Sequence, residues 1–247
     1  MVKKIIKSVL RKNGFRIINE KQLYPDIELP FKELSKQVIP FTMTSMERLY
    51  SLYQSVKYIN QNKIEGDFVE CGVWKGGSSM MAALSFKSLG DTNRRFLLYD
   101  TYEGMSEPTE KDVDFKNDSA FKNWKKIKEE KTLEMCYNTL DEVEINMKAT
   151  AFPFDKIQFI KGKVEDTIPA NLPGKIAILR LDTDWYESTY HELKHLYPLL
   201  QSGGVLIIDD YGYWKGAREA VDQYFKEENI FPLLHRIDHT GRIMIKK

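Results

Sequence analysis

The stretch LRLDTDWYEST, residues 179–189, completes an apolar run and then brings two carboxylates one residue apart. Residues 176–178 extend the run on its N-terminal side, and a continuous apolar run predicts a strand that is buried on both faces. Side chains two residues apart in an extended chain point to the same side, so Asp182 and Asp184 are predicted to face one spot. Two such carboxylates repel each other unless a positive charge lies between or beside them.

Further strand-like runs of Val, Ile, Leu and Phe alternate with helical patterns from residue 66 onward. Besides KIAILRLD (175–182), these runs are GDFVECG (66–72), RRFLLYD (94–100), KIQFIKG (156–162) and GGVLIIDD (203–210). Between them, SSMMAALSFKSL (78–89) and TYHELKHLYPLL (189–200) have the spacing of helices. At the end of the chain, FPLLHRID, a turn at residues 239–241 and RIMIKK form a predicted hairpin. The pattern predicts a doubly wound α/β fold with a mostly parallel, seven-stranded sheet.

Two parts of the chain lie outside this alternation. Residues 1–65 are predicted to form a helical N-terminal extension, which includes residues 44–60, before an α/β domain of residues 66–247. The start of the extension has a basic amphipathic pattern, typical of a docking or dimer-contact helix, with contact to a membrane surface as the alternative. Residues 104–155 form a charge-rich insertion, helical over residues 122–148, which we expect to be a lid or a dimer element.

The composition is that of an ordinary globular protein. A chain of 247 residues with 42% hydrophobic and 30% charged residues suits one domain. Its net charge of +1 gives no electrostatic footprint for nucleic acid. The two cysteines, Cys71 and Cys136, have no metal-ligand spacing and indicate a reducing compartment, which we expect to be the cytoplasm. No apolar run approaches the length of a transmembrane helix.

The segment VECGVWKGGSS, residues 69–79, follows the first predicted strand and opens a helix, where doubly wound folds bind nucleotides. It lacks the glycine spacing and the Walker lysine of the motifs that bind pyrophosphate. Its glycines would let a ligand approach the backbone, the helix start at Ser78 would bind a carboxylate, and Asp100 would bind a ribose diol. The combination favours a nucleoside cofactor without pyrophosphate, and S-adenosylmethionine fits. Glycines that are required only by a tight turn are the alternative.

A second acidic pair, Asp209 and Asp210, follows the fifth predicted strand. Ligands of open α/β sheets bind at the carboxyl ends of the strands, so Asp182 and Asp209 are predicted to be neighbours. Carboxylates gathered there need a counter-charge, and oxygen ligands without a Cys or His cluster favour Mg²⁺ or a similar cation. The structural alternative is that Asp184 and Asp210 cap the helices that follow them.

The motifs FVECGVWKGGSS, LLYDTYEGM, LRLDTDWYEST and GGVLIIDDYG together resemble the macrocin O-methyltransferase family, bacterial class I enzymes that methylate sugar hydroxyls with S-adenosylmethionine. The resemblance runs from about Thr42 to the C-terminus. It implies a metal site at Asp182, Asp209 and Asp210, a general base at Asp184, and an insertion after residue 104 that covers the substrate. The S-adenosylmethionine contacts that it implies are Glu70, Cys71, Gly72, Ser78, Asp100, Thr101, Lys163, Val164, Glu165 and Asp182.

A sugar hydroxyl is a poor nucleophile at neutral pH and needs a base, a metal ion or both. On this interpretation Asp182 holds the metal ion and Asp184 takes the proton, while His235 and His239 are rival bases. Aromatic residues crowd the same strand ends, where they stack on a sugar or adenine or pack in the core: Trp185, Tyr186, Tyr211, Tyr213 and Trp214.

Two other functions stay open on the sequence. A catechol-type methyltransferase of the same fold would prefer a flat aromatic pocket, and a non-catalytic nucleotide-binding protein would have kept only the fold. Unpaired carboxylates are costly to retain in a closed site. A non-catalytic protein is therefore disfavoured by the four aspartates at positions 182, 184, 209 and 210. We expect a small-molecule sugar or glycoside acceptor, no nucleic-acid partner, no transmembrane segment, and a homo-oligomer.

Overall fold

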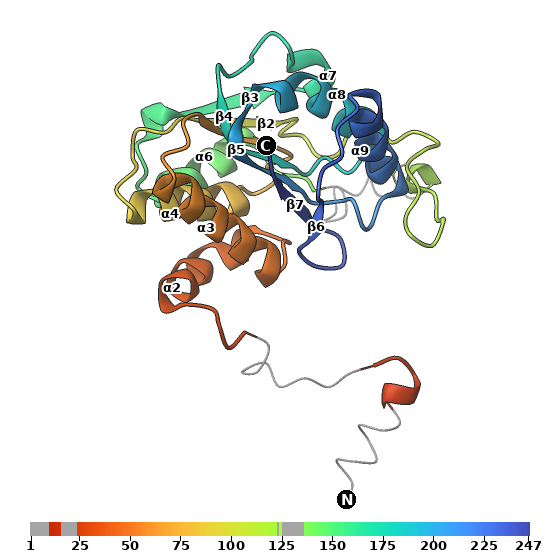
Figure 1. Cartoon of the computed structure of the whole chain (residues 1–247), viewed down its shortest axis with the longest axis horizontal. Helices are drawn as coiled ribbons and strands as arrows, with labels where there is room; N and C mark the ends of the chain where they lie inside the picture. The colour runs from red at the N-terminus through yellow and green to blue at the C-terminus, as the bar shows by residue number, and fades with distance from the viewer. Residues whose placement is uncertain (1–9, 16–23, 123, 125–135) are drawn as a thin grey trace, which may run out of the picture. The chain divides into compact units, whose positions relative to one another are not determined.

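The computed structural model describes residues 10–15, 24–122, 124 and 136–247 of the chain. The chain divides into two compact units, residues 1–33 and 34–247, and the α/β fold lies in the second (Figure 1). Helix α3 (Met46–Gln61) belongs to this second unit, so part of the predicted N-terminal extension is built into the domain. The amphipathic pattern at the start of the chain falls mainly on residues 1–9, outside the described residues.

The centre of the domain is a seven-stranded sheet with the strand order β3-β2-β1-β4-β5-β7-β6. The strands are β1 (Asp67–Cys71), β2 (Phe96–Asp100), β3 (Ile157–Lys161), β4 (Ile176–Leu181), β5 (Leu200–Ile208), β6 (His235–Arg236) and β7 (Arg242–Ile245). Strands β1 to β5 pair in parallel, and β7 runs antiparallel to both of its neighbours. Each parallel strand overlaps a run predicted from the sequence, and the predicted hairpin forms β6 and β7. The predicted fold class is therefore confirmed.

Helices cover both faces of the sheet, as the crossover connections of a parallel sheet require. Figure 1 shows α3, α4 and α6 on one side of the strands and α7, α8 and α9 on the other. Their bounds are α4 (Gly77–Ser88), α6 (Leu140–Ala149), α7 (Val164–Thr167), α8 (Tyr186–Leu196) and α9 (Lys215–Glu227). Further elements are α2 (Leu29–Val38), η2 (Ile39–Phe41), η4 (Phe154–Lys156) and η5 (Tyr197–Leu199).

The central strands β1 and β4 are buried along their whole length. Because both faces pack against helices, their sequences are continuous apolar runs rather than alternating ones. Besides Asp67 at the start of β1, two charged residues lie within these strands, Glu70 in β1 and Arg180 in β4, with exposed fractions of 1% and 2%. The strand register places them directly opposite each other. A buried acid and a buried base are therefore neighbours at the centre of the sheet.

The helix predicted over residues 122–148 is not continuous in the structure: residues 122 and 124 are helical, and the non-helical residues 136–139 separate them from α6. Helix α6 begins at Leu140, and residues 123 and 125–135 lie outside the described part. The Thr139 hydroxyl accepts the Glu142 N–H, and the Glu142 carboxylate accepts the Thr139 N–H. This capping box starts the helix at that point, and its T-x-x-E signature stands in the sequence.

The first part of the insertion is held against helices α8 and α9. The fully buried Asp112 accepts the Tyr186 N–H at the start of α8, over 2.8 Å. The Lys215 N–H at the start of α9 donates to the Val113 carbonyl, over 2.9 Å. These bonds satisfy N–H groups that a helix start leaves open. They fix this part of the insertion beside the strand ends, while the lid role of residues 104–155 stays a prediction.

The carboxyl ends of the central strands meet at one edge of the sheet. The register pairs Cys71 at the end of β1 with Leu181 at the end of β4. Just beyond, the Asp182 N–H donates to the Cys71 carbonyl and the Asp209 N–H to the Leu181 carbonyl, both over 2.9 Å. The chain leaves β1 at Gly72, where an added Cβ would lie 1.9 Å from the carbonyl oxygen of Asp182. Glycine at this position therefore permits the close approach that gathers the predicted site.

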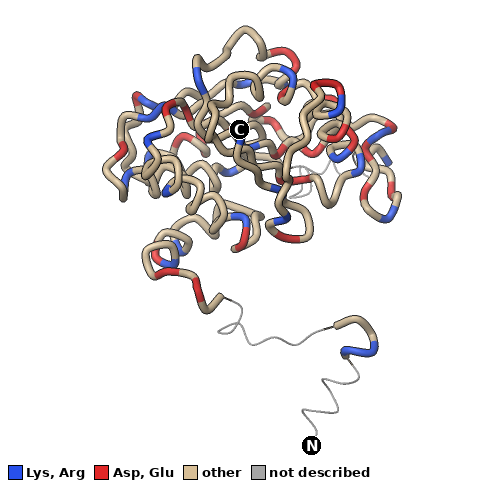
Figure 2. The backbone as a smooth tube through the Cα atoms, viewed as in Figure 1, with Lys and Arg blue, Asp and Glu red and all other residues tan. Residues whose placement is uncertain are grey.

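Positions of Lys or Arg and of Asp or Glu are interspersed along the backbone of the domain, as Figure 2 shows. This distribution agrees with the net charge of +1. Within the described ranges, no helix has the length and apolar character needed to cross a membrane.

Candidate active site

A cavity of about 570 Å³ opens at the carboxyl edge of the sheet, a volume typical of small-molecule sites. Most of the predicted site residues line it: Gly72, Ser78, Asp100, Thr101, Lys163, Val164, Glu165, Asp182, Asp184, Asp209 and Asp210. Glu70 and Cys71 are buried and are not among the lining residues, so their contacts with a cofactor stay predictions.

The loop after β1 is held by Asp100 at the end of β2. One carboxylate oxygen of Asp100 accepts the N–H groups of Val73, over 2.6 Å, and Trp74, over 3.0 Å. The other oxygen accepts the Tyr102 N–H over 2.7 Å. Burial raises the pKa of Asp100, although these N–H groups oppose the shift. Asp100 therefore shapes the loop, and its bond to a ribose remains a predicted additional contact.

The glycines of this loop make contacts within the protein. Gly76 has a left-handed φ of 85° and is the N-cap of α4. A Cβ on Gly77 would lie 2.5 Å from the carbonyl oxygen of Phe41, and Gly72 lies against the backbone that follows β4. These contacts support the alternative in which the turn itself requires glycine. Ser78, in the first turn of α4, nevertheless lines the cavity, as predicted.

The acidic pairs form one cluster at the neighbouring end of the cavity. Asp182, Asp209 and Asp210 each offer a carboxylate oxygen, and these oxygens lie within 4.8 Å of one another. The caps considered for Asp184 and Asp210 are not formed, because the N-cap positions of α8 and α9 are tryptophans without a side-chain cap. The structural alternative for these two aspartates is therefore wrong.

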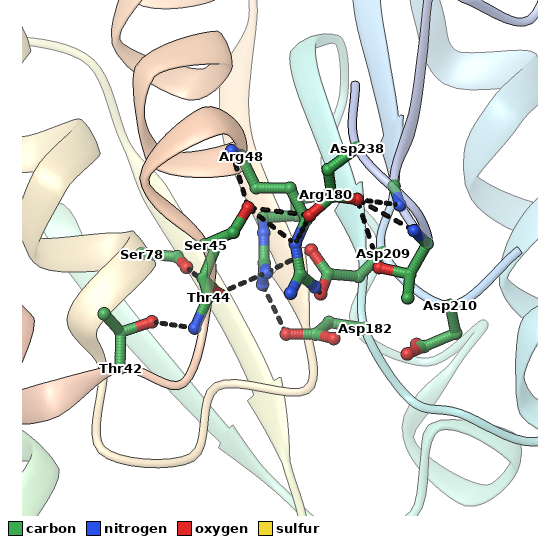
Figure 3. A network of polar contacts seen from close by, with 12 residues as sticks. Thr42, Thr44, Ser45, Arg48, Ser78, Arg180, Asp182, Asp209, Asp210 and Asp238 are labelled. Atoms are coloured by element: carbon green, nitrogen blue, oxygen red, sulfur yellow. Dashed lines mark hydrogen bonds and ion pairs between the residues drawn. The ribbon is translucent and has the colours of Figure 1, made fainter. Parts of the chain in front are cut away.

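Arg180 of β4 lies within the acidic cluster (Figure 3). Its guanidinium contacts Glu70 at 2.6 Å, Asp182 at 2.7 Å and Asp209 at 2.6 Å. It also donates to the Thr44 hydroxyl over 3.2 Å. Burial alone would lower the pKa of Arg180, but the surrounding carboxylates raise it well above its ordinary value, so the side chain stays charged. Arg180 is thus the positive charge that the paired aspartates require.

A second arginine, Arg48 of helix α3, also contacts the cluster. Its guanidinium bonds Asp209 and lies 3.0 Å from Asp238 in the β6–β7 turn (Figure 3). Asp238 also accepts the Ser45 hydroxyl over 2.7 Å. Burial opposes the shift, but bonds from Ser45, from the backbone of the turn and from Arg48 lower the pKa of Asp238 to about 2. Arg48 therefore ties α3 to the end of β5 and to the terminal hairpin.

The two arginines do not fully offset the cost of ionising the buried carboxyl groups of the cluster. Burial raises the pKa of Asp182 well above its ordinary value in spite of Arg180, and burial with the neighbouring Asp184 does the same for Asp210. Raised carboxyl pKa values mean that burial disfavours the ionised forms, which a bound cation would stabilise. Three converging carboxylate oxygens fit a hard divalent cation such as Mg²⁺.

Asp184 lies beside the cluster in a left-handed conformation with a φ of 66°. Its N–H donates to a carboxylate oxygen of Asp210 over 3.2 Å, and its Oδ1 accepts the indole N–H of Trp214 over 2.7 Å. Burial and the charge of Asp182 raise the pKa of Asp184 to about 7. A carboxylate with a pKa near neutrality is suited to accept a proton from a hydroxyl group.

The two rival bases differ in position. His239 lines the cavity, but its side chain is 75% exposed. His235 is exposed on β6 and is not a lining residue. Asp184 is the more enclosed of the cavity's candidate bases, and the geometry favours it over both histidines.

The aromatic residues near the strand ends divide into two groups. Trp185, Tyr213 and Trp214 line the cavity and form a wall next to Asp184. Tyr186 stacks on a tyrosine of its own helix, with ring centroids 6.0 Å apart, and the Tyr211 hydroxyl donates to Asp222. The first group is placed to stack on a ligand, and the second packs within the protein.

The sequence analysis missed both arginines of the site. Arg180 had a signal, because a charged residue inside a buried strand needs a counter-ion, and Asp182 two residues later shares its side of the strand. Arg48 is 161 positions away from Asp209 and had no local signal. The cavity wall also includes a part of the lead-in that the motifs did not indicate: Phe41, Thr42, Met43 and Thr44.

A sheet with this strand order and a cavity at its carboxyl edge defines the class I methyltransferase fold. Residues 9–246 match the family described as Macrocin-O-methyltransferase (TylF), and the chain belongs to this family of S-adenosylmethionine-dependent O-methyltransferases. The match covers nearly the whole chain.

Individual relatives agree with the family. The chain is 34% identical over 203 residues to the 8-demethyl-8-(2,3-dimethoxy-alpha-L-rhamnosyl)-tetracenomycin-C 4'-O-methyltransferase of Streptomyces olivaceus. This match covers 82% of this chain and 74% of the relative. It is 30% identical over 203 residues to the Mycinamicin III 3''-O-methyltransferase of Micromonospora griseorubida, with 82% and 77% covered. The solved structure of the O-methyltransferase NovP is similar with a TM-score of 0.76 and 25% identity, over 92% of this chain and 100% of that chain.

Proposed function

We propose that the enzyme transfers the methyl group of S-adenosylmethionine to a hydroxyl of a sugar or a glycosylated small molecule, with the help of a divalent cation. The observation that carries this proposal is a single cavity that joins the loop after β1 to an acidic cluster with a near-neutral base. A relative that is 34% identical is named for an acceptor with a rhamnosyl group, which supports a sugar as the acceptor.

In this proposal the cofactor lies along the β1 and β2 side of the cavity. The loop at Gly72, the helix start at Ser78 and the carboxylate of Asp100 hold its methionine and ribose portions. Residues 163–165, which line the cavity at the start of α7, contact the adenine. S-adenosylmethionine supplies the electrophilic methyl group when it is bound.

The acceptor lies at the acidic end, where Asp184 takes the proton of the reacting hydroxyl. Asp182, Asp209 and Asp210 would hold the divalent cation, which supplies Lewis-acid stabilisation of the negative charge that develops on the acceptor. The wall of Trp185, Tyr213 and Trp214 orients the sugar ring and excludes water from the base. Holding the two reactants in one cavity supplies much of the rate.

Methyl transfer from labelled S-adenosylmethionine tests this proposal. We expect the label to appear in simple rhamnosides or related glycosides with Mg²⁺, and to fall to background in EDTA. Catechol, the acceptor of the alternative enzyme class, should remain unlabelled under the same conditions. Transfer to catechol alone, or equal transfer with Mg²⁺ and with EDTA, would overturn the assignment.

We further propose a reducing, cytoplasmic location and a homo-oligomeric state. Free thiols at Cys71 and Cys136 support the location. Light scattering coupled to gel filtration measures the oligomeric state directly, and a monomeric mass would contradict the second proposal.

A further inference from the structure

Trp214 contacts the proposed base Asp184 from the start of another element, helix α9. It is the N-cap residue of helix α9, and its indole N–H donates to Oδ1 of Asp184 over 2.7 Å. An indole nitrogen is a donor only, so this bond has one direction. The oxygen of Asp184 that accepts it is therefore occupied.

The connection from β5 to α9 holds both the backbone and the side chain of Asp184. The Asp184 N–H donates to the carboxylate of Asp210, at the start of this connection, and the Trp214 N–H donates to the Asp210 carbonyl over 3.0 Å. Asp184 has a left-handed φ, which residues other than glycine adopt rarely. The contact at its backbone N–H and the contact at its carboxylate together hold Asp184 in this conformation.

Trp214 is itself fixed by its surroundings. Its ring packs edge-to-face on Trp185 with centroids 5.0 Å apart, and in the same way on Tyr213, also at 5.0 Å. Its backbone forms a bridge with Asp114 of the insertion. A ring held on two sides and at its backbone can fix the group to which it donates.

We propose that Trp214 is a positioning residue for proton removal, because its indole N–H holds Oδ1 of Asp184 and so fixes the orientation of the carboxylate that takes the proton of the acceptor. The inference rests on the proposed function, since it needs Asp184 to be the base. It adds a residue of helix α9, whose ring forms a wall of the cavity, to the machinery of the reaction.

Trp214→Phe tests the inference, because it removes the N–H and keeps an aromatic wall. We expect kcat to fall about 10- to 100-fold, the effect of misplacing a reacting group, while the KM values for acceptor and S-adenosylmethionine change little. A residue that served only to bind the acceptor would change KM instead. Circular dichroism and the melting temperature establish that the variant is folded.

Trp185→Phe is the matched control. Trp185 belongs to the same aromatic wall, but its indole N–H donates to the Ser106 carbonyl over 3.0 Å rather than to the base. Each substitution is then combined with Asp184→Asn. We expect Trp214→Phe to cost little further rate in that background, and Trp185→Phe to reduce the rate by the same factor with and without Asp184.

The outcomes separate this inference from the function on which it rests. If Asp184→Asn is impaired but Trp214→Phe keeps the wild-type kcat, or slows both backgrounds equally, the role of Trp214 is wrong and the base stands. If Asp184→Asn itself keeps the wild-type rate, the proposed base is wrong, and the inference falls with it.

Discussion

The guanidinium of Arg180 lies 2.7 Å from the carboxylate of Asp182, two residues further along the chain, and 2.6 Å from Glu70 on the neighbouring strand. These contacts join β1 and β4 at the point where the sheet reverses its strand order, which is where doubly wound folds bind ligands. Removing one partner of a buried ion pair costs about 3–5 kcal/mol of stability, because the other charge is left uncompensated. Arg180 therefore both stabilises the sheet and fixes Asp182 at the edge of the cavity.

Arg48 should weaken the binding of a divalent cation. Its positive charge bonds Asp209, a predicted ligand whose other oxygen is already held by Arg180. We expect Arg48→Gln to raise the affinity for Mg²⁺ about tenfold, because one repelling charge is removed. The melting temperature in EDTA should fall, since Asp209 and Asp238 lose a counter-charge. Calorimetric titration of Mg²⁺ and thermal melts measure the two effects.

Arg95→Gln is the control for this prediction. Arg95 forms an ion pair with Asp67 at the opposite end of β1, at 2.6 Å, and its side chain is 56% exposed. Its removal should leave the affinity for Mg²⁺ unchanged. Weaker binding of Mg²⁺ by Arg48→Gln would show that Arg48 supports the ligand set rather than competing with the cation.

Without a divalent cation, the stability of the enzyme should fall as the pH rises from about 4 to 7. Burial raises the pKa of Asp184 to about 7, and those of Asp182 and Asp210 shift in the same direction, from about 3.9 in an unfolded chain. In this window the folded protein binds more protons than the unfolded chain, so stability decreases with increasing pH.

Melting temperatures in EDTA across this pH range check the sign. Mg²⁺ should flatten the dependence by compensating the ionised carboxylates, and Asp184→Asn should reduce the slope in EDTA by removing one shifted group. A melting temperature in EDTA that rises steadily over the same range would contradict the raised pKa values of these carboxyl groups.

S-adenosylmethionine should bind without a metal ion, because the loop after β1 and Asp100 are distinct from the three predicted metal ligands. Calorimetry in EDTA should therefore still detect binding. Asp100→Ala should weaken it by roughly 1.5–3 kcal/mol, through loss of a charged hydrogen bond. In this structure Asp100 also holds the N–H groups of Val73 and Trp74, so part of the loss would come from the loop. Unchanged affinity would show that the assignment of Asp100 is wrong.

Much of the fold could be predicted because its central strands are buried on both faces. Runs such as FVEC and IAILRL leave few alternatives to a strand in a parallel sheet, and the structure places β1 and β4 there. The insertion was harder, because charge-rich segments without a clear period do not specify where a helix starts. Thr139 and Glu142 carried that information, because their capping box starts α6 at Leu140. The helix predicted from residue 122 is therefore not continuous.

The acidic part of the site was predictable for a similar reason. Asp182 and Asp209 directly follow two strands, and neighbouring strands of a parallel sheet end at the same edge. The contacts that compensate and orient these acids come from elsewhere. Arg48 arrives from a helix that precedes the sheet, and Trp214 begins a helix that follows it. Such contacts depend on tertiary packing, which no local pattern of the sequence specifies.

The central claim is a division of labour between Asp182, which holds the cation, and Asp184, which takes the proton. Metal titration combined with single-turnover rates of Asp182→Asn and Asp184→Asn tests it most directly. We predict that Asp182→Asn raises the Mg²⁺ concentration needed for activity, because a neutral amide is a weaker ligand for a hard cation. Asp184→Asn should keep its affinity for Mg²⁺ and for S-adenosylmethionine and lose about 10²- to 10⁴-fold in rate. A near-wild-type rate of Asp184→Asn, with the proton leaving through His239 or another group, would contradict the claim.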